Sequence, residues 1–297
     1  MLDIQHISKT YGARRVLDDV SFSVRPGRLT GFVGGNGAGK TTTMRGILGI
    51  VQPDEGVVTL DGAPISHTDR ARFGYMPEER GLYPKMPVHE QVVYFAELHG
   101  VDHARAVRNA DELLDELGLA ERRDDKLEAL SLGNQQRAQI AATLAHDPEV
   151  LLLDEPFSGL DPIAVDVVLR VLARYASRDV PVLFSSHQLD VVERLSDDLV
   201  IISGGVIKAS GARAEMQERH SAGLYRLKVA GDAGWTRDLV AQGVDAVVEE
   251  LAGDSAILRA ADDDAAQQVL RAALDRGPVL EFGRHLVKLS EIYREVI

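Results

Sequence analysis

The octet at residues 34–41 reads Gly-Gly-Asn-Gly-Ala-Gly-Lys-Thr, and this stretch decides the fold. It fits the phosphate-binding pattern G-x-x-x-x-G-K-[ST]. The apolar residues 29–33 before it predict a short buried strand, and residues 42–48 after it predict a helix. A strand, a glycine-rich loop and a helix N-terminus in this order form a cradle of backbone N–H groups for an anion. We therefore expect Lys40 to contact the β- and γ-phosphates of a nucleotide and Thr41 to offer its hydroxyl to Mg²⁺.

The amino-acid composition is that of a folded protein, and its negative net charge argues against a nucleic acid partner. Apolar residues make up 45% of the 297 residues, which is typical of a globular chain with a large core. The formal net charge of −13 argues against duplex DNA, whose binding needs a basic face, so no nucleic acid partner is expected. The chain has no cysteine, which excludes disulfides and cysteine-based zinc sites.

The hydropathy pattern gives no sign of a membrane segment. No apolar run approaches the roughly 20 residues that a membrane-spanning helix needs. The first residues lack the basic and apolar regions of a signal peptide. We therefore expect no direct membrane span and a cytoplasmic location, with any membrane part supplied by another polypeptide.

The rhythm of apolar segments predicts an α/β fold for residues 1–218. The alternation over residues 2–24 favours antiparallel strands with one buried face. Helical spacing covers 87–98, 104–117 and 134–145, which we interpret as a helical subdomain of about residues 85–147. Continuous apolar strands at 150–153, 180–184 and 199–202 then alternate with helices at 163–176 and 189–195, which indicates a parallel sheet.

The character of the sequence changes around residues 210–222, and we place a domain boundary near residue 218. Strand signals at 225–229, 246–251, 256–259 and 279–281 alternate with helices at 235–242 and 262–275, and a last helix covers 289–296. The order βαββαβα predicts a small α+β domain over residues 219–297.

Two further stretches favour phosphate chemistry. Residues 150–156, Val-Leu-Leu-Leu-Asp-Glu-Pro, form a buried strand that ends in two carboxylates, at the edge of a parallel sheet where ligands bind. We expect Asp154 to hold Mg²⁺ and Glu155 to act as general base on the attacking water. Residues 130–137 place Ser131 and Gly133 at a helix N-terminus, which is a second anion-binding device.

With these motifs in order, the chain resembles the nucleotide-binding subunit of an ATP-binding-cassette (ABC) transporter over about residues 1–218. The resemblance is greatest to the ATPases that partner ABC-2-type membrane subunits in exporters. It implies a P-loop ATPase domain with a mixed sheet core, an antiparallel β subdomain and a helical subdomain, followed by the C-terminal α+β domain. The phosphate loop then comprises Gly34, Asn36, Gly37, Ala38, Gly39, Lys40, Thr41 and Thr42.

The resemblance also implies roles for residues outside the phosphate loop. Tyr11 matches the aromatic residue that stacks on adenine. Ser131 and Gly133 match the signature that binds the γ-phosphate held by the opposite subunit. Asp161, in Ser-Gly-Leu-Asp at 158–161, matches the D-loop, and His187 matches the switch histidine at the γ-phosphate. Together these residues imply a homodimer with two composite ATP sites, with Glu155 and His187 as the catalytic pair.

Three motifs depart from the family pattern: the phosphate loop, the signature and the segment that ends at residue 78. The second loop position carries Gly35 in place of proline, and the first glycine of the signature is Leu132, followed by Asn134 in place of glutamine. The sequence Tyr-Met-Pro-Glu at 75–78 aligns with a motif that ordinarily ends in glutamine, so Glu78 replaces the amide. A carboxylate ligates Mg²⁺ through oxygen, and we assign Glu78 to the metal site with Thr41 and Asp154.

The resemblance implies that the partner subunits lie in the cell membrane, that they contact residues 79–84, and that the ATPase sits on the inner face of the membrane through them. Two roles remain open for the C-terminal domain, a subunit contact through residues 284–289 or a stabilising appendage. Two other functions also remain open, a soluble ABC ATPase outside transport and a nucleotide-gated regulator marked by Leu132 and Glu78.

Overall fold

The computed structural model describes residues 1–79, 81–241 and 243–297, and the chain divides into two compact units. One unit comprises Met1–Arg213 with Val296–Ile297, and the other comprises Ala214–Glu295. The sequence pattern had placed a boundary near residue 218. Arg80 of the predicted partner-contact segment and Gln242 at the end of a predicted helix lie outside the described residues.

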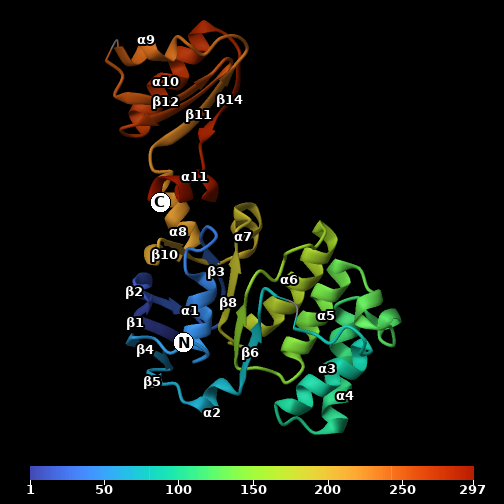
Figure 1. Ribbon diagram of the computed structural model, residues 1–297. Coiled ribbons are helices and arrows are strands. Elements are labelled where there is room, and N and C mark those ends of the chain that lie inside the picture. Colours follow the sequence, from blue (N-terminus) through green and yellow to red (C-terminus); the bar gives the residue numbers. More distant parts are fainter. Residues whose placement is uncertain (80, 242) are drawn as a thin grey trace. The chain divides into compact units, whose positions relative to one another are not determined.

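A six-stranded mixed sheet forms the centre of the first unit (Figure 1). Its order is β10 (Val206–Ala212), β9 (Asp198–Ser203), β3 (Leu29–Val33), β8 (Val182–Ser186), β7 (Val150–Leu153) and β6 (Phe73–Met76). The five strands from β9 to β6 are parallel, and β10 joins β9 antiparallel at one edge. Every residue of β3, β7 and β8 is buried, as expected for parallel strands covered on both faces.

A second, antiparallel sheet contains β1 (Leu2–Tyr11), β2 (Arg14–Val24), β4 (Glu55–Leu60) and β5 (Ala63–Pro64), in the order β2-β1-β4-β5. Its inner face shares one hydrophobic core with the central sheet and α1 (Lys40–Ile47). In that core the rings of Phe22 and Phe32 lie 5.2 Å apart. Packing of the two sheets therefore fixes β2 beside the loop that leads into α1.

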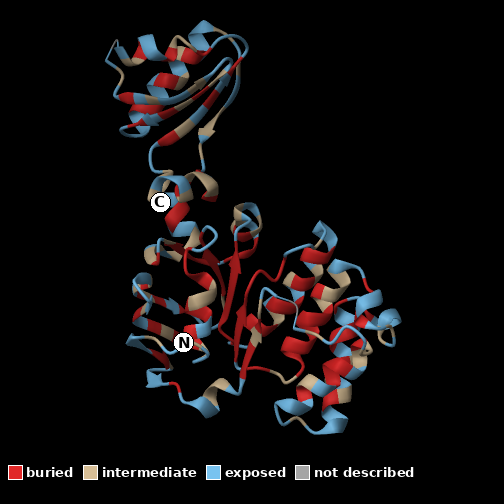
Figure 2. Ribbon diagram, viewed as in Figure 1, coloured by how far each residue is buried: buried red, intermediate tan, exposed pale blue. Residues whose placement is uncertain are grey.

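The helices of this unit after α1 are α2 (His67–Arg70), α3 (Val88–Leu98), α4 (His103–Glu116), α5 (Leu132–Leu144), α6 (Pro162–Ala176) and α7 (Leu189–Leu195), with short 3-10 turns at Ala120–Arg122 and Leu127–Ala129. Helices α5, α6 and α7 pack on the central sheet, while α3 and α4 pack on each other and on α5. Figure 2 shows buried residues along these helices and along the strands of the sheet. Helix α7 lies so close to β3 that a Cβ on Gly31 would stand 2.6 Å from Val192 Cγ1. Only glycine allows this approach.

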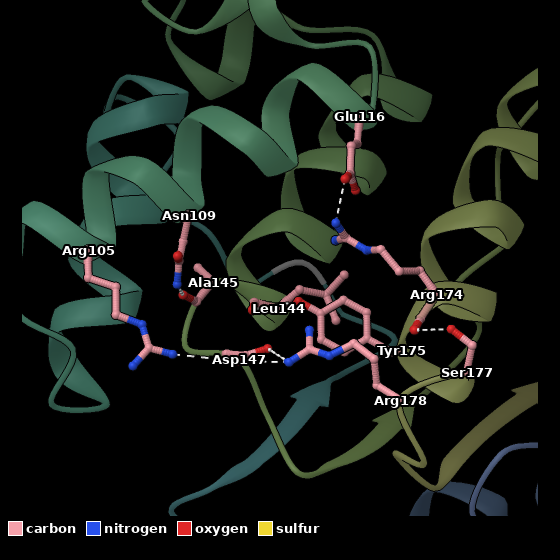
Figure 3. Close-up of polar contacts among 10 residues, drawn as sticks. All are labelled: Arg105, Asn109, Glu116, Leu144, Ala145, Asp147, Arg174, Tyr175, Ser177 and Arg178. Carbon is pink, nitrogen blue, oxygen red and sulfur yellow. Dashed lines mark hydrogen bonds and ion pairs between the residues drawn. The ribbon is translucent and has the colours of Figure 1, made fainter.

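A polar network ties α4 and the end of α5 to α6 (Figure 3). Asp147, in the turn after α5, accepts a hydrogen bond from Arg178 at 3.0 Å and lies 3.5 Å from Arg105 of α4. Arg174 of α6 pairs with Glu116 of α4. The other bonds drawn there include Asn109 to Ala145 O at 2.7 Å and Tyr175 to Leu144 O at 3.2 Å. These contacts hold α4 and the end of α5 against α6.

The second unit has the split βαβ arrangement of a ferredoxin-like domain. Its antiparallel sheet has the order β12 (Ala246–Ala252), β13 (Ser255–Ala260), β11 (Leu224–Val229) and β14 (Val279–Arg284). Helices α9 (Thr236–Ala241) and α10 (Asp263–Arg276) contribute to its core, which includes Leu227, Leu258 and Val269. Helices α8 (Arg213–His220) and α11 (Leu289–Val296) complete the chain. Within the described residues, no helix is long and apolar enough to span a membrane.

The predicted fold class is confirmed, and the differences lie in short elements. The sequence pattern did not predict β6, α2, β10 or α8. The helical spacing over 104–117 predicts an apolar side that includes Val107, Leu113 and Leu114. The two leucines are buried, but Val107 is only half-buried, and Ala106 and Ala110 take the other buried positions. Small residues at a helix contact give a weak hydropathy signal, so the pattern pointed to the larger side chain.

The stacked rings of His99 and His146 predict a loss of stability in acid. Their centroids lie 3.8 Å apart. Burial first, and the neighbouring His99 second, lower the pKa of His146 from 6.5 to about 4. Between these values the unfolded chain binds a proton that the folded chain excludes, so stability falls as the pH falls through this window. We expect this group to cost about 3 kcal/mol of unfolding free energy between pH 7 and pH 4.

Urea denaturation at pH 7 and pH 4 measures this loss, and the His146→Phe variant should lose less stability than the wild type over the same interval. The exposed His67→Phe variant is the control and should behave as the wild type does. An equal acid sensitivity of His146→Phe and wild type would contradict the assignment.

Candidate functional site

The loop between β3 and α1 is shaped by close approaches of its glycines. A Cβ on Gly34 would lie 2.5 Å from Ile202 O, and a Cβ on Gly39 would lie 2.7 Å from Leu17 Cδ2. Gly39 also has a φ of +113°, which side chains rarely allow. Helix α1 begins directly after it at Lys40, and no side chain caps its first turn. The first N–H groups of the helix are therefore available to an anion.

The ammonium group of Lys40 is held by its own loop. Its Nζ donates hydrogen bonds to Gly34 O at 2.6 Å and Gly35 O at 3.3 Å. Lys40 is buried, and a buried ammonium is stable only where carbonyl oxygens or an anion surround it. These contacts place a positive charge at the head of α1, where phosphate oxygens could replace the carbonyl contacts.

The carboxyl end of β7 brings Asp154 to the head of α1. Thr41 Oγ1 donates to Asp154 Oδ2 at 2.6 Å, and Asp154 N donates to Met76 O at 2.8 Å. The buried Ser185, on the neighbouring strand β8, donates to the other carboxylate oxygen of Asp154 and accepts from Glu155 N at 2.9 Å. The ends of three adjacent parallel strands thus meet at one point, as expected at this edge of such a sheet.

Glu155 lies next to Asp154 in an unusual backbone conformation. Its φ is +53°, in the left-handed region, and its side chain is buried. His187, in the loop between β8 and α7, stands with Nδ1 2.9 Å from Glu155 Oε1. Burial raises the pKa of the Glu155 carboxyl, and the hydrogen bond from His187 acts in the opposite direction. A carboxylate with a raised pKa accepts a proton more readily than a free one, which suits a general base.

Lys40, Thr41, Asp154 and Glu155 line one cavity of about 370 Å³. Its lining also includes Glu78, which follows β6, and two residues of β2 that the sequence did not single out, Arg14 and Val16. The full lining is Arg14, Val16, Gly35, Asn36, Gly37, Ala38, Gly39, Lys40, Thr41, Thr42, Glu78, Asp154 and Glu155. Among the charged members, Arg14 and Lys40 face three carboxylates.

The cavity combines an anion site with oxygen ligands for a hard cation. The first turn of α1 and Lys40 suit phosphate groups, and the oxygens of Thr41 and Asp154 are of the kind that Mg²⁺ prefers. Within the described part of the chain, no three His, Cys, Asp or Glu side chains converge closely enough to hold a metal by themselves. Mg²⁺ is typically held by one or two carboxylates plus substrate phosphates, which agrees with this arrangement.

Six of the predicted site residues are not among the residues that line this cavity. Gly34 lies at the start of the phosphate loop, and His187 reaches the cavity only through its contact with Glu155. The other four lie elsewhere in the chain. Tyr11 lies at the end of β1, about half exposed, with Lys9 Nζ 5.5 Å from its ring centroid. Ser131 caps the N-terminus of α5, and Asp161 caps that of α6 by accepting from Ala164 N at 2.8 Å. A Cβ on Gly133 would lie 3.3 Å from Gly159 O, so the start of α5 lies beside the loop that precedes α6.

Two buried glutamines of α5 connect that helix to the cavity, and sequence reasoning did not find them. Gln136 Nε2 donates to Glu155 O at 3.0 Å and to Pro156 O at 3.1 Å. Gln139 Nε2 donates to Pro77 O at 2.9 Å, next to Glu78. A glutamine on the buried side of a predicted helix is the one signal that could have identified them, since buried amides need partners.

Comparison with known proteins identifies the family. The model of the ABC transporter family matches residues 17–158. The chain is 34% identical to the Bacillus subtilis ABC transporter ATP-binding protein YhaQ, over 100% of this chain and 98% of that protein. It is 35% identical to the Haemophilus influenzae lipopolysaccharide export system ATP-binding protein LptB, over 71% of this chain and 90% of that one.

Solved structures agree in fold. The structure of an ATP-binding subunit of an ABC transporter superposes with a TM-score of 0.68 at 31% identity. The match covers 74% of this chain and 93% of that one.

Removing the Ser185 hydroxyl should destabilise the chain. In Ser185→Ala the buried Glu155 N–H loses its acceptor and the Asp154 carboxylate loses a donor, which costs about 1–3 kcal/mol for a buried unsatisfied group. The measurement is the shift of the urea midpoint relative to the wild type. Ser177→Ala, which removes an exposed serine hydroxyl bonded to Arg174 O, should change it little. Equal stability of the two variants would contradict the bonding described for Ser185.

Proposed function

Because this chain belongs to the ATP-binding proteins of ABC transporters, which are ATPases, we propose that it powers export of a substrate through separate ABC-2-type membrane subunits. The observation that carries the proposal is the single cavity that Lys40, Thr41, Asp154 and Glu155 line together. Export is supported by the relative LptB, the ATP-binding protein of a lipopolysaccharide export system. In this proposal the chain works on the cytoplasmic face of the membrane, attached through its partner.

Nucleotide binding is proposed for the phosphate loop and the residues beside it. The N–H groups of the first turn of α1 and the Lys40 ammonium take the β- and γ-phosphates. Thr41, Asp154 and Glu78 hold Mg²⁺, and their oxygens fit this ion because it prefers hard donors. When bound, the ion neutralises phosphate charge. The 2.6 Å hydrogen bond between Thr41 and Asp154 supports this assignment, since it brings two of the three ligands together.

Hydrolysis is proposed for Glu155 and His187. The Glu155 carboxylate accepts a proton from the attacking water as the water oxygen bonds to the γ-phosphorus and the bond to ADP breaks. His187 Nδ1 donates to Glu155 Oε1, which orients the carboxylate. The burial of Glu155 supports this role, because burial raises the pKa of its carboxyl and makes it a stronger base.

A second copy of the chain is proposed to complete each ATP site. Ser131 and Gly133 of the signature and Asp161 lie outside the cavity of their own chain, while Ser131 is exposed at the start of α5. This separation supports two composite sites, in which the signature of one copy contacts the γ-phosphate in the other. Tyr11, exposed at the end of β1, is available to stack on adenine.

The docking surface for the membrane subunit is proposed on the predicted segment 79–84, continued by residues 85–87 and α3. Tyr83 and Tyr94 are exposed, and with Phe95 they form an aromatic cluster with centroids 5.7 to 6.3 Å apart. A cavity of about 550 Å³ lies beside Tyr83, Pro84, Met86 and Pro87. Gln91 is fully buried and accepts from Tyr83 N at 2.6 Å, which fixes this segment. An apolar hollow of this kind suits an amphipathic segment of a partner.

The C-terminal unit is proposed as an accessory domain.

The first test measures Mg²⁺-dependent ATP turnover as a function of chain concentration. The wild type should show a rate that rises faster than linearly with concentration, because two copies form each site. Glu155→Gln should lower turnover by about 10²-fold or more through loss of the base, while ATP-bound Glu155→Gln accumulates as a dimer in light scattering. Lys40→Ala should weaken ATP binding by about tenfold or more through loss of a charge on the phosphates.

Two results would count against parts of this proposal. An ATP-bound Glu155→Gln chain that stays monomeric even with its membrane partner would contradict the composite sites. A wild type that binds ATP but does not turn it over, alone or with the membrane subunits, would favour a nucleotide-gated regulator.

Arg14 should contribute to nucleotide affinity. Its guanidinium lines the cavity and has no hydrogen bond or ion pair with any residue that the structure describes, so its charge is available to a phosphate. We expect Arg14→Ala to weaken ATP and ADP binding by similar factors of about 3 to 10. The neighbouring Arg15, which pairs with Asp18 at 2.8 Å, provides the control. Calorimetric titration should find Arg15→Ala close to wild type; equal effects of both variants would refute a direct role for Arg14.

A further inference from the structure

We propose that Glu78 makes ATP binding by this chain depend on a divalent cation far more strongly than an amide at this position would. The inference rests on the proposed function, because it concerns the same nucleotide cavity. It adds a property of this chain: ATP without metal binds much more weakly than ATP with metal.

The charges that line the cavity do not balance. Glu78, Asp154 and Glu155 contribute three carboxylates, while Arg14 and Lys40 contribute two cations. Lys40 already donates to two loop carbonyls. A metal-free nucleotide triphosphate adds several further negative charges to this space. Like charges at short range repel strongly where the surroundings are partly buried. Removal of one carboxylate from this lining should therefore raise the affinity of the cavity for ATP without metal.

Glu78 is the carboxylate whose charge is least compensated. Asp154 accepts from Thr41 and Ser185, and Glu155 is bonded to His187. No hydrogen bond or ion pair joins the Glu78 side chain to another residue in the ranges that the structure describes. Its side chain is exposed to the cavity, so removal of the charge leaves no internal partner unsatisfied.

The backbone around Glu78 is fixed, which keeps the carboxylate at the cavity. Gln139 Nε2 donates to Pro77 O at 2.9 Å and lies 3.4 Å from Glu79 O, so one buried amide holds the residues on both sides of Glu78. Strand β6, which ends at Met76, anchors the segment to the central sheet. The carboxylate is therefore carried by a supported turn at the end of a strand.

The carboxylates alone do not make a metal site. Across residues 1–79, 81–241 and 243–297, no three His, Cys, Asp or Glu side chains converge as a set of ligands. Mg²⁺ would then be held by protein carboxylates together with phosphate oxygens of ATP. Mg²⁺ and ATP would each strengthen the binding of the other. A carboxylate in place of an amide strengthens this coupling in both directions, because it repels the bare anion and attracts the cation.

The experiment is a titration of the isolated chain with ATP, once in EDTA and once in Mg²⁺, by calorimetry. The quantity compared is the coupling ratio, Kd without metal divided by Kd with metal. Glu78→Gln keeps the shape of the side chain and one oxygen ligand, and removes only the charge. We expect it to tighten ATP binding in EDTA and to lower the coupling ratio by about tenfold or more.

Glu79→Gln is the matched control, because it removes the same charge from the next residue, which does not line the cavity. Its coupling ratio should equal that of the wild type. The inference is overturned if Glu78→Gln keeps the wild-type ratio, or if both variants lower the ratio equally, since the effect would then be one of net charge. A wild type that fails to bind ATP even with Mg²⁺ would instead overturn the proposed function, so the two failures are distinguishable. Thermal unfolding without ligand establishes that both variants fold.

Discussion

The hydrogen bond from Thr41 Oγ1 to Asp154 Oδ2 is the contact on which the cavity depends. It joins residues 113 positions apart in the sequence, at the head of α1 and the end of β7. Neither end would be in place without the parallel sheet, because only parallel strands bring their carboxyl ends to one edge. The buried runs of β3, β7 and β8 provide the free energy of burial that holds these ends together.

The sequence predicted the parts of the molecule whose signal is local. The glycine loop, the apolar strand before Asp154 and the helix that starts near Ser131 each carry their pattern within about ten residues, and the structure has elements at all three places. The short strand β6 was missed because its four residues, Phe-Gly-Tyr-Met, offer neither alternation nor a continuous apolar run.

Site residues that depend on tertiary contact were beyond the reach of pattern reasoning. Arg14 lines the cavity because two sheets pack on one core, and Ser185 lies beside Asp154 because β8 neighbours β7 in the sheet order. Neither residue belongs to a motif with a fixed spacing. Gln136 is similar, since its partners are backbone carbonyls that follow another strand. Such residues are set by sheet topology, which a single sequence specifies only indirectly.

The left-handed backbone of Glu155 has a consequence for how this chain tolerates change. A residue with a side chain in this conformation costs about 1–2 kcal/mol relative to its ordinary state, and glycine there would relieve that cost. The residue best for folding is thus not the residue that the proposed chemistry needs. Selection of variants for heat resistance alone would be expected to enrich glycine at this position. The selected chains would be more stable but would lack the carboxylate that the proposed ATP hydrolysis needs.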